Sequence, residues 1–309
     1  MYRSIKEEIS TKLRSSFLLL SFCTIFYSCS NSTGIKSVNT LGYALTEPDK
    51  IITLPGNLLE ISGLTVIDSS SVACIQDEKG VVYIFDILND KIKKEIHFNS
   101  GGDYEGICRV DGTMYILRSD GVLFEILNYE SSSFSNKIKL EGIETIDNEG
   151  LCYDRKNNRL LIAPKSKPEK SSGFKGNHII YAFDLISDSL IKEPVIEIDL
   201  SAVRRFIGEK TDIYVKKNKK KDKRHLPDIN FKPSDICIHP VTHKLYLLSG
   251  EEHILYVFDT SGIIEYAERL DPDLFNMPEG ISFFKNGDML ISNESGNRYP
   301  TILRFNYKL

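Results

Sequence analysis

The 309-residue chain lacks the short patterns that mark zinc sites and nucleophilic serines. It has no Cys-x-x-Cys pair, no Cys-His spacing of a zinc site, no Gly-x-Ser-x-Gly and no metallohydrolase His pair. Zinc hydrolysis and serine-nucleophile chemistry are therefore disfavoured.

The chain also lacks an excess of positive charge. Its formal net charge is −4 and its isoelectric point is about 5.9, and no basic recognition motif is present. Nucleic acid is not an expected partner, whereas cations or neutral ligands suit the composition better.

No apolar run at the N-terminus is long enough to cross a bilayer. The run 17–27 follows four Lys and Arg residues and ends at Ser28 and Cys29, which is typical of a targeting segment. This end resembles the lipobox of bacterial lipoproteins, although Phe26 and Tyr27 depart from its usual residues. We expect a lipoprotein signal peptide over 1–28, a lipid on Cys29 and a polar tether over 29–40; the alternative is an ordinary cleaved signal peptide.

What the sequence does contain is a repeated phrase. "EISGLTV", "DYEGICR", "DNEGLCY", "KPSDICI" and "MPEGISF" align with spacings of 43, 44, 85 and 45 residues. The aligned reference positions are Ser62, Glu105, Glu149, Ser234 and Glu279. Each phrase is followed by a turn and by further apolar strands, such as "VVYIFD" and "ILYVFD".

Four short strands in each unit of this length predict an all-β fold, a β-propeller over 41–309. Five blades are expected, with the segment 43–54 supplying the outer strand that closes the ring. The 85-residue interval is interpreted as an insertion over 201–231, with a degenerate sixth blade as the alternative. The basic run 216–224 within it is either a solvated loop or a docking site for a polyanion.

Propeller geometry predicts that the phrases bring polar side chains to one mouth of the central channel. The first strand of a unit starts on the face where the second strand ends, and residues two positions apart share a side. The opposite face is expected to receive only turn residues. The predicted ligand face comprises Glu60, Ser62, Asp77, Glu78, Asp103, Glu105, Arg118, Asp120, Asp147, Glu149, Lys165, Ser234, Asp235, Glu251, His253, Glu279, Asn293 and Glu294.

Clustered carboxylates repel one another unless they are protonated or neutralised by a cation. Hard oxygen donors favour Ca²⁺, with Mg²⁺ as the weaker candidate, so Glu105, Glu149 and Glu279 are the predicted metal ligands. The alternative is structural: these side chains cap blade junctions, and the following Gly lets strands approach closely.

The phrases, in this order and followed by "ILRF", resemble the SdiA-regulated family of bacterial propeller proteins, over about residues 41–309. The resemblance implies a membrane-associated propeller in the bacterial envelope, here lipid-anchored and facing the periplasm, and it brings no established reaction. Glu105, Glu149 and Glu279 match the acidic positions of the family, whereas Ser62 and Ser234 depart from them.

Two functions fit this pattern. The first is a membrane-anchored binding module that holds a divalent cation, a small ligand or a protein partner at its carboxylate-lined face. The alternative is a metal-dependent hydrolase of the phytase-like esterase, phosphodiesterase or lactonase type, with Arg118 or Lys165 holding an anionic substrate. A lactonase-like set would draw on Glu149, Asn293 and Asp235, although no spacing fixes them, and binding is the favoured function.

Overall fold

The computed structural model describes residues 39–132, 134–143, 145, 147–168, 173–174, 176–209 and 229–309. The described residues belong to one compact unit. The predicted signal peptide, the lipidation site at Cys29 and the basic run 216–224 lie outside the described residues. Within the described ranges, no helix has the length and apolar character needed to cross a membrane.

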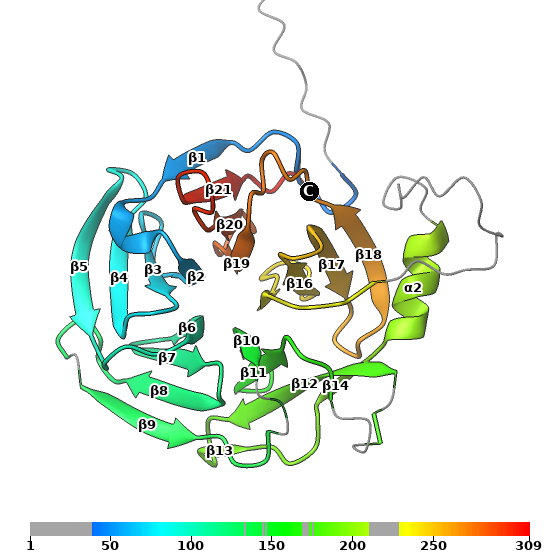
Figure 1. Cartoon of the computed structure of the whole chain (residues 1–309), viewed down its shortest axis with the longest axis horizontal. Coiled ribbons are helices and arrows are strands. Elements are labelled where there is room, and N and C mark those ends of the chain that lie inside the picture. Colours follow the sequence, from blue (N-terminus) through cyan, green and yellow to red (C-terminus); the bar gives the residue numbers. More distant parts are fainter. Residues whose placement is uncertain are drawn as a thin grey trace, which may run out of the picture. The chain divides into compact units, whose positions relative to one another are not determined.

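Five antiparallel sheets stand in a ring (Figure 1); in the first four the strands follow the chain from the centre outward, and in the fifth the N-terminal strand is the outermost. The first two sheets are β2 (Ile61–Val66), β3 (Ser71–Gln76), β4 (Val81–Asp86) and β5 (Lys91–His97), and β6 (Tyr104–Val110), β7 (Thr113–Arg118), β8 (Val122–Ile126) and β9 (Ser135–Lys139). The third is β10 (Asn148–Asp154), β11 (Arg159–Pro164), β12 (Asn177–Asp184), β13 (Ser189–Leu190) and β14 (Ile196–Asp199). The fourth and fifth are β15 (Asp235–Ile238), β16 (Leu245–Ser249), β17 (Ile254–Phe258) and β18 (Ile264–Arg269), and β19 (Pro278–Phe283), β20 (Met289–Asn293), β21 (Thr301–Phe305) and β1 (Lys50–Thr53).

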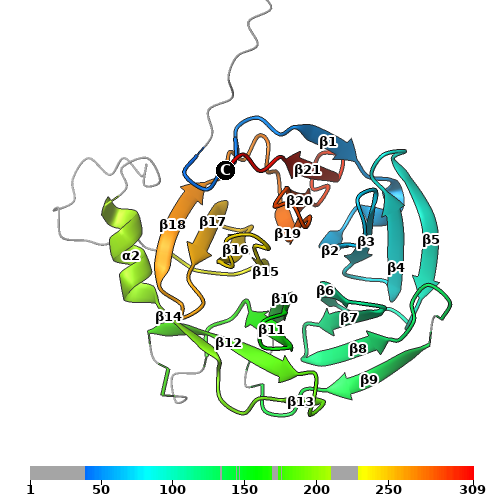
Figure 2. The ribbon, with the colours of Figure 1, turned by 180° about the vertical axis from the view of Figure 1, so that it is seen from behind.

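The predicted five-bladed propeller is thus confirmed. The innermost strands β2, β6, β10, β15 and β19 surround the centre when the ring is viewed from either side (Figures 1 and 2). Strand β1 pairs antiparallel with β21, with Ile52 opposite Ile302, so the N-terminal strand closes the ring as expected. Pairing the two ends of the propeller in one blade removes a free edge.

The interval between the third and fourth blades contains a helix, α2 (Leu200–Glu209), which lies outside β18 (Figure 1). It buries Leu200, Val203 and Ile207, which are spaced to share one helical face. Before α2, β14 pairs with β12 over Asn177–Ile180. The short β13 pairs with the other end of β12, so β14 forms the longer part of the outer edge of that blade. A short 3-10 helix (Gly56–Leu58) precedes the first blade.

The core lies between blades rather than at the centre of the ring. Both faces of β3, β4 and β16 pack on neighbouring blades, so every residue of these strands is buried, and the sequences are apolar except for polar residues at their ends. In the outer strand β5, by contrast, only Ile92 and Ile96 are covered. Cys74, Cys108 and Cys152 are buried free thiols, and Cys237 is half-buried.

Candidate functional site

The repeated phrase forms a β-bulge at the start of four innermost strands. The register shifts between Ile61 and Gly63, Tyr104 and Gly106, Asn148 and Gly150, and Pro278 and Gly280. The residue inside each shift is the reference position of the repeat: Ser62, Glu105, Glu149 and Glu279. A bulged residue leaves the regular ladder, which turns its side chain away from the pleat.

The glycine that follows the bulge is required by the neighbouring blade. A Cβ atom on Gly106 would lie 2.6 Å from Leu151 Cβ and 2.7 Å from the carbonyl oxygen of Glu149. A Cβ on Gly150 would lie 2.9 Å from the backbone nitrogen of Ile236. The Glu-Gly pair therefore places a carboxylate at the mouth of the channel while it lets adjacent innermost strands approach.

Glu149 is the most enclosed of these carboxylates. Its side chain is 4% exposed, and Oε1 accepts a hydrogen bond of 3.0 Å from Lys165 Nζ, at the end of the paired strand β11. Burial raises the pKa of Glu149, and the charge of Lys165 opposes this shift. Burial alone would lower the pKa of Lys165, but Glu149, Glu279 and Asp147 together raise it.

The other carboxylates of this mouth act on one another. Burial and the nearby Glu149 raise the pKa of Glu105. Burial, Glu294 and Glu149 raise the pKa of Glu279 to about 8, and burial with Glu60 and Asp77 raises that of Glu294 to about 7. An ionised carboxylate of this mouth is therefore stabilised when its neighbour is protonated or when a cation lies between the two.

Asp77, at the end of the second strand of the first blade, has a buried oxygen without a partner. Its Oδ1 makes no hydrogen bond among the described residues, and burial together with Glu60 and Asp103 raises its pKa. We call the following set the acidic mouth: Glu60, Asp77, Asp103, Glu105, Asp147, Glu149, Lys165, Glu279 and Glu294.

The serine units and Asp235 have structural partners instead. Ser62 Oγ donates to the carbonyl of Tyr104 at 2.6 Å, and Ser234 Oγ donates to that of Pro278 at 3.1 Å, so each serine ties its strand to the next blade. Asp235 takes the position that is glycine in the other units. Its two oxygens accept backbone N–H groups of Ile236 and Ile281, each at 2.8 Å.

The remaining predicted residues pair with close neighbours. Arg118 makes a two-point ion pair with Asp120 at 2.8 Å, and Glu251 pairs with Lys232 at 2.6 Å. Asn293 Nδ2 donates to Thr301 Oγ1 at 3.0 Å, while its buried Oδ1 has no partner among the described residues. Asp235 therefore differs in role from Glu149 and Asn293, the other members of the lactonase-like set, because its carboxylate oxygens accept hydrogen bonds from backbone amides.

The donor chemistry of the acidic mouth fits a hard cation, but its side chains do not form a closed coordination set. Within the described ranges, no three Asp, Glu, His or Cys side chains are arranged to hold a metal ion. The ammonium of Lys165 already lies against Glu149. A divalent cation here would keep part of its water shell and would compete with Lys165 for Glu149.

No family model and no curated protein matches the chain. Several solved structures do align with it. A glutaminyl cyclase from Myxococcus xanthus aligns with a TM-score of 0.56 at 10% identity, over 85% of this chain and 96% of that one. A streptogramin B lyase (TM-score 0.43, 11% identity, 84% and 72% covered) and a luciferin-regenerating enzyme (TM-score 0.47, 9% identity, 84% and 95% covered) also align.

These neighbours are β-propeller proteins. The likeness to the glutaminyl cyclase, at 10% identity, shows the fold alone and transfers no activity to this chain.

The residues that the sequence did not point to lie at the other end of the channel. That face was expected to receive only turn residues, but the C-terminal halves of all five innermost strands line a pocket there. Arg109 and Tyr153 of this pocket belong to the same strands as Glu105 and Glu149. The repeat pattern gave no signal for them, because this position is not of one residue type across the blades.

Proposed function

We propose that the chain is an envelope-anchored binding propeller whose acidic mouth takes up a cation. The observation that carries this proposal is the excess of partly buried carboxylates over the single ammonium of Lys165 within the acidic mouth. Carboxylates held at this spacing are stabilised either by protons or by a bound positive charge. A bound cation therefore relieves the repulsion between these carboxylates, and this relief contributes to its binding free energy.

Calcium is the preferred ion because of how the oxygens are distributed. Ca²⁺ accepts a variable number of oxygen ligands, including water, whereas Mg²⁺ demands near-ideal octahedral geometry. An open set of carboxylates suits the more tolerant ion. Glu149, Glu279 and Glu105 would supply the first oxygens, and Lys165 would move off Glu149 as the ion enters.

The anchor and the family likeness are part of the same proposal. A lipid on Cys29 would hold the propeller at the membrane of a bacterial envelope on the periplasmic side, as in the SdiA-regulated proteins that the repeated phrases resemble. The bound cation would then fix a small ligand or a protein partner at the acidic mouth. A metal-dependent hydrolase would need the same ion, so cation binding is tested first.

The experiment is a thermal melt of the full chain, stripped with chelator and titrated with Ca²⁺, Mg²⁺, Mn²⁺ and Zn²⁺. A ligand that binds the folded state raises the melting temperature in a saturable way. We expect Ca²⁺ to act at the lowest concentration, Glu149→Gln to lose the shift and Lys165→Met to reach it at lower Ca²⁺.

The control variant is Lys91→Met, which removes an exposed lysine of β5, the outermost strand of its blade. It should respond to Ca²⁺ as the unaltered chain does. If no ion shifts the melt, or if Glu149→Gln keeps the whole shift, the acidic mouth is not a cation site.

The anchor is tested separately by Cys29→Ala in the cell that makes the protein. We expect the variant to leave the membrane fraction. Full retention in that fraction would contradict the lipid anchor and would leave the cation proposal unaffected.

A further inference from the structure

The second mouth of the channel holds a pocket of about 630 Å³. Its floor is a ring of apolar side chains, one from each blade, two residues after the reference position of the repeat and almost fully buried. The ring comprises Leu64, Ile107, Leu151, Ile236 and Ile281. The next residue of each strand is small, which leaves the pocket open above this floor: Thr65, Cys108, Cys152, Cys237 and Ser282.

Cations surround the opening of this pocket. Arg109, Arg155, Lys285 and Arg304 all line it. Arg304 is neutralised by Asp288 at 2.6 Å, and Arg109 donates to the carbonyl of Ile67 at 3.2 Å. The Nε atoms of both arginines are buried and have no partner among the described residues.

Arg155 and Lys285 are the free charges of this opening. Both are exposed, and neither has a hydrogen-bond or ion-pair partner in the described part of the chain. They also line an adjoining pocket of about 990 Å³, which shares Tyr153 and Pro240 with the first. The two pockets therefore adjoin at Arg155 and Lys285.

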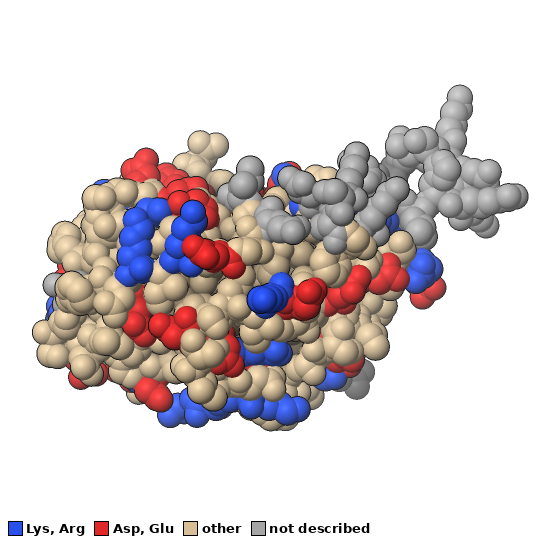
Figure 3. Space-filling view, turned by 90° about the horizontal axis from the view of Figure 1, so that it is seen from below, with Lys and Arg blue, Asp and Glu red and all other residues tan. Residues whose placement is uncertain are grey.

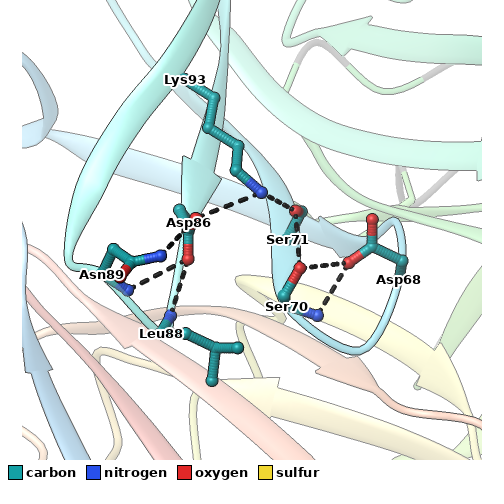
Figure 4. A network of polar contacts seen from close by, with 7 residues as sticks. All are labelled: Asp68, Ser70, Ser71, Asp86, Leu88, Asn89 and Lys93. Atoms are coloured by element: carbon teal, nitrogen blue, oxygen red, sulfur yellow. Dashed lines mark hydrogen bonds and ion pairs between the residues drawn. The ribbon is translucent and has the colours of Figure 1, made fainter.

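The acidic groups near this opening already have partners. Asp68 accepts hydrogen bonds from Ser70 N at 2.7 Å and Ser70 Oγ at 2.9 Å, and Figure 4 shows its carboxylate turned toward Ser70. In the adjoining pocket, Asp154 is held by Arg159 at 2.9 Å, and Asp259 accepts from Ser261. Asp68 keeps its charge, because its donors are neutral. The pocket nevertheless holds more cations than anions, since Arg109, Arg155 and Lys285 stand against Asp68 alone once Arg304 is paired with Asp288.

We propose that this second mouth, which we call the basic mouth, binds a small organic anion that joins an apolar group to a phosphate. The apolar group would lie on the floor of the pocket, where burial of apolar surface favours it. The phosphate would lie at the opening between Arg155 and Lys285. A guanidinium binds phosphate oxygens in two-point geometry, and an ammonium adds a point charge.

The test uses phenyl phosphate, titrated into the full chain by calorimetry at low ionic strength. We expect one site per chain, tighter binding than for inorganic phosphate, and weakening as salt is added. The double variant Arg155→Gln/Lys285→Gln should weaken binding by at least about tenfold, since two charge-assisted hydrogen bonds are lost. Its charge-reversed form, with Glu at both positions, should weaken it further.

The matched control is Lys91→Glu/Lys192→Glu, which gives the same change of net charge as Arg155→Glu/Lys285→Glu at two exposed lysines that line neither pocket. It should bind phenyl phosphate within about twofold of the unaltered chain. Thermal melts of all variants check that they are folded. Absence of saturable binding to the unaltered chain, or equal loss in the control, would overturn the proposal.

A third comparison tests whether phenyl phosphate binding depends on the basic mouth and not on the acidic mouth. Glu294→Gln alters the acidic mouth and should leave phenyl phosphate binding unchanged. If this variant changes binding as much as the Arg155 and Lys285 variants do, the anion does not bind at the basic mouth.

Discussion

The two mouths of the channel are built from the same five strands and carry opposite charge. At the acidic mouth the strands begin, and bulges hold partly buried carboxylates that share Lys165 as an internal counterion. At the basic mouth the strands end, and exposed cations stand without partners among the described residues over an apolar floor. Because every innermost strand runs in the same direction, a residue's place in the repeat decides the mouth at which it lies.

The outer surface shows no such separation. Figure 3, which views the ring edge-on, shows Lys and Arg side chains lying among Asp and Glu side chains. Ion pairs such as Lys244–Glu265 and Lys50–Asp90 belong to the outer strands and turns. Exposed pairs of this kind contribute little to stability. The sorting of charge at the two mouths is therefore a property of the innermost strands.

The largest expected effect comes from breaking the ring on which both mouths depend. Gly106→Ala puts a Cβ within 2.7 Å of the Glu149 carbonyl oxygen and should lower the free energy of unfolding by about 3 kcal/mol. Chemical denaturation measures this change. Gly56→Ala is the control, because a Cβ there meets nothing within 4 Å. Equal stability of the two variants would show that the innermost strands have room to separate.

The next effect concerns the internal counterion of the acidic mouth. Lys165→Met leaves the buried carboxylate of Glu149 unpaired and should cost about 2 kcal/mol near pH 8. The cost should shrink toward pH 5, because Glu149 then takes up a proton. Denaturation at both pH values, with Lys91→Met alongside, measures it. A cost that does not change with pH would mean that Lys165 is not the counterion of Glu149.

A third test uses pH alone. The pKa values of Glu279 and Glu294 are raised from 4.5 to about 8 and about 7, so between these limits the folded state binds more protons than the unfolded state. Stability should therefore fall as pH rises through this window.

Melts at about pH 5 and about pH 8.5 measure this fall, and Ca²⁺ should reduce it at the higher pH by neutralising the ionised carboxylates. Glu279→Gln should make the profile flatter. A rise of stability over the same window would mean that the unfolded state, and not the folded state, binds the additional protons.

The smallest expected effect tests whether the serine of a repeat unit has a structural role, unlike the glutamates of the cation site. Ser62→Ala removes one hydrogen bond to the carbonyl of Tyr104 and should cost about 1 kcal/mol or less, without changing the Ca²⁺ response. Exposed Ser69 is the control position. A lost Ca²⁺ response in Ser62→Ala would place Ser62 within the cation site after all.

Much of the fold was readable because the phrase repeats. The spacing of "DYEGICR" and "DNEGLCY" predicted the blades, and the unpaired segment 43–54 predicted the closing strand that pairs at Ile52 with Ile302. The structure also explains the pattern itself: Glu is the bulged residue, Gly gives clearance to the next blade, and the following Ile or Leu forms the floor of the basic mouth.

The division of roles among the candidate residues was not readable in the same way. Asp235 follows Ser234 as Gly150 follows Glu149, yet Asp235 accepts backbone hydrogen bonds from Ile236 of its own strand and from Ile281 of the adjacent blade. Arg118 and Lys165 both end second strands, but Arg118 pairs with Asp120 and Lys165 with Glu149. These outcomes depend on side-chain distances between and within blades, which equivalent positions in a repeat do not specify.

The repeat, the all-β architecture and the end of each strand at which its carboxylates lie all follow from the sequence alone, because local periodicity sets strand direction and side-chain alternation. The folded ring was needed to show which carboxylates share Lys165, which oxygen of Asp77 lacks a partner among the described residues, and that Arg155 and Lys285 meet at a second mouth. Those facts arise when the ring closes, since closure brings into contact residues that are tens to hundreds of positions apart in the chain.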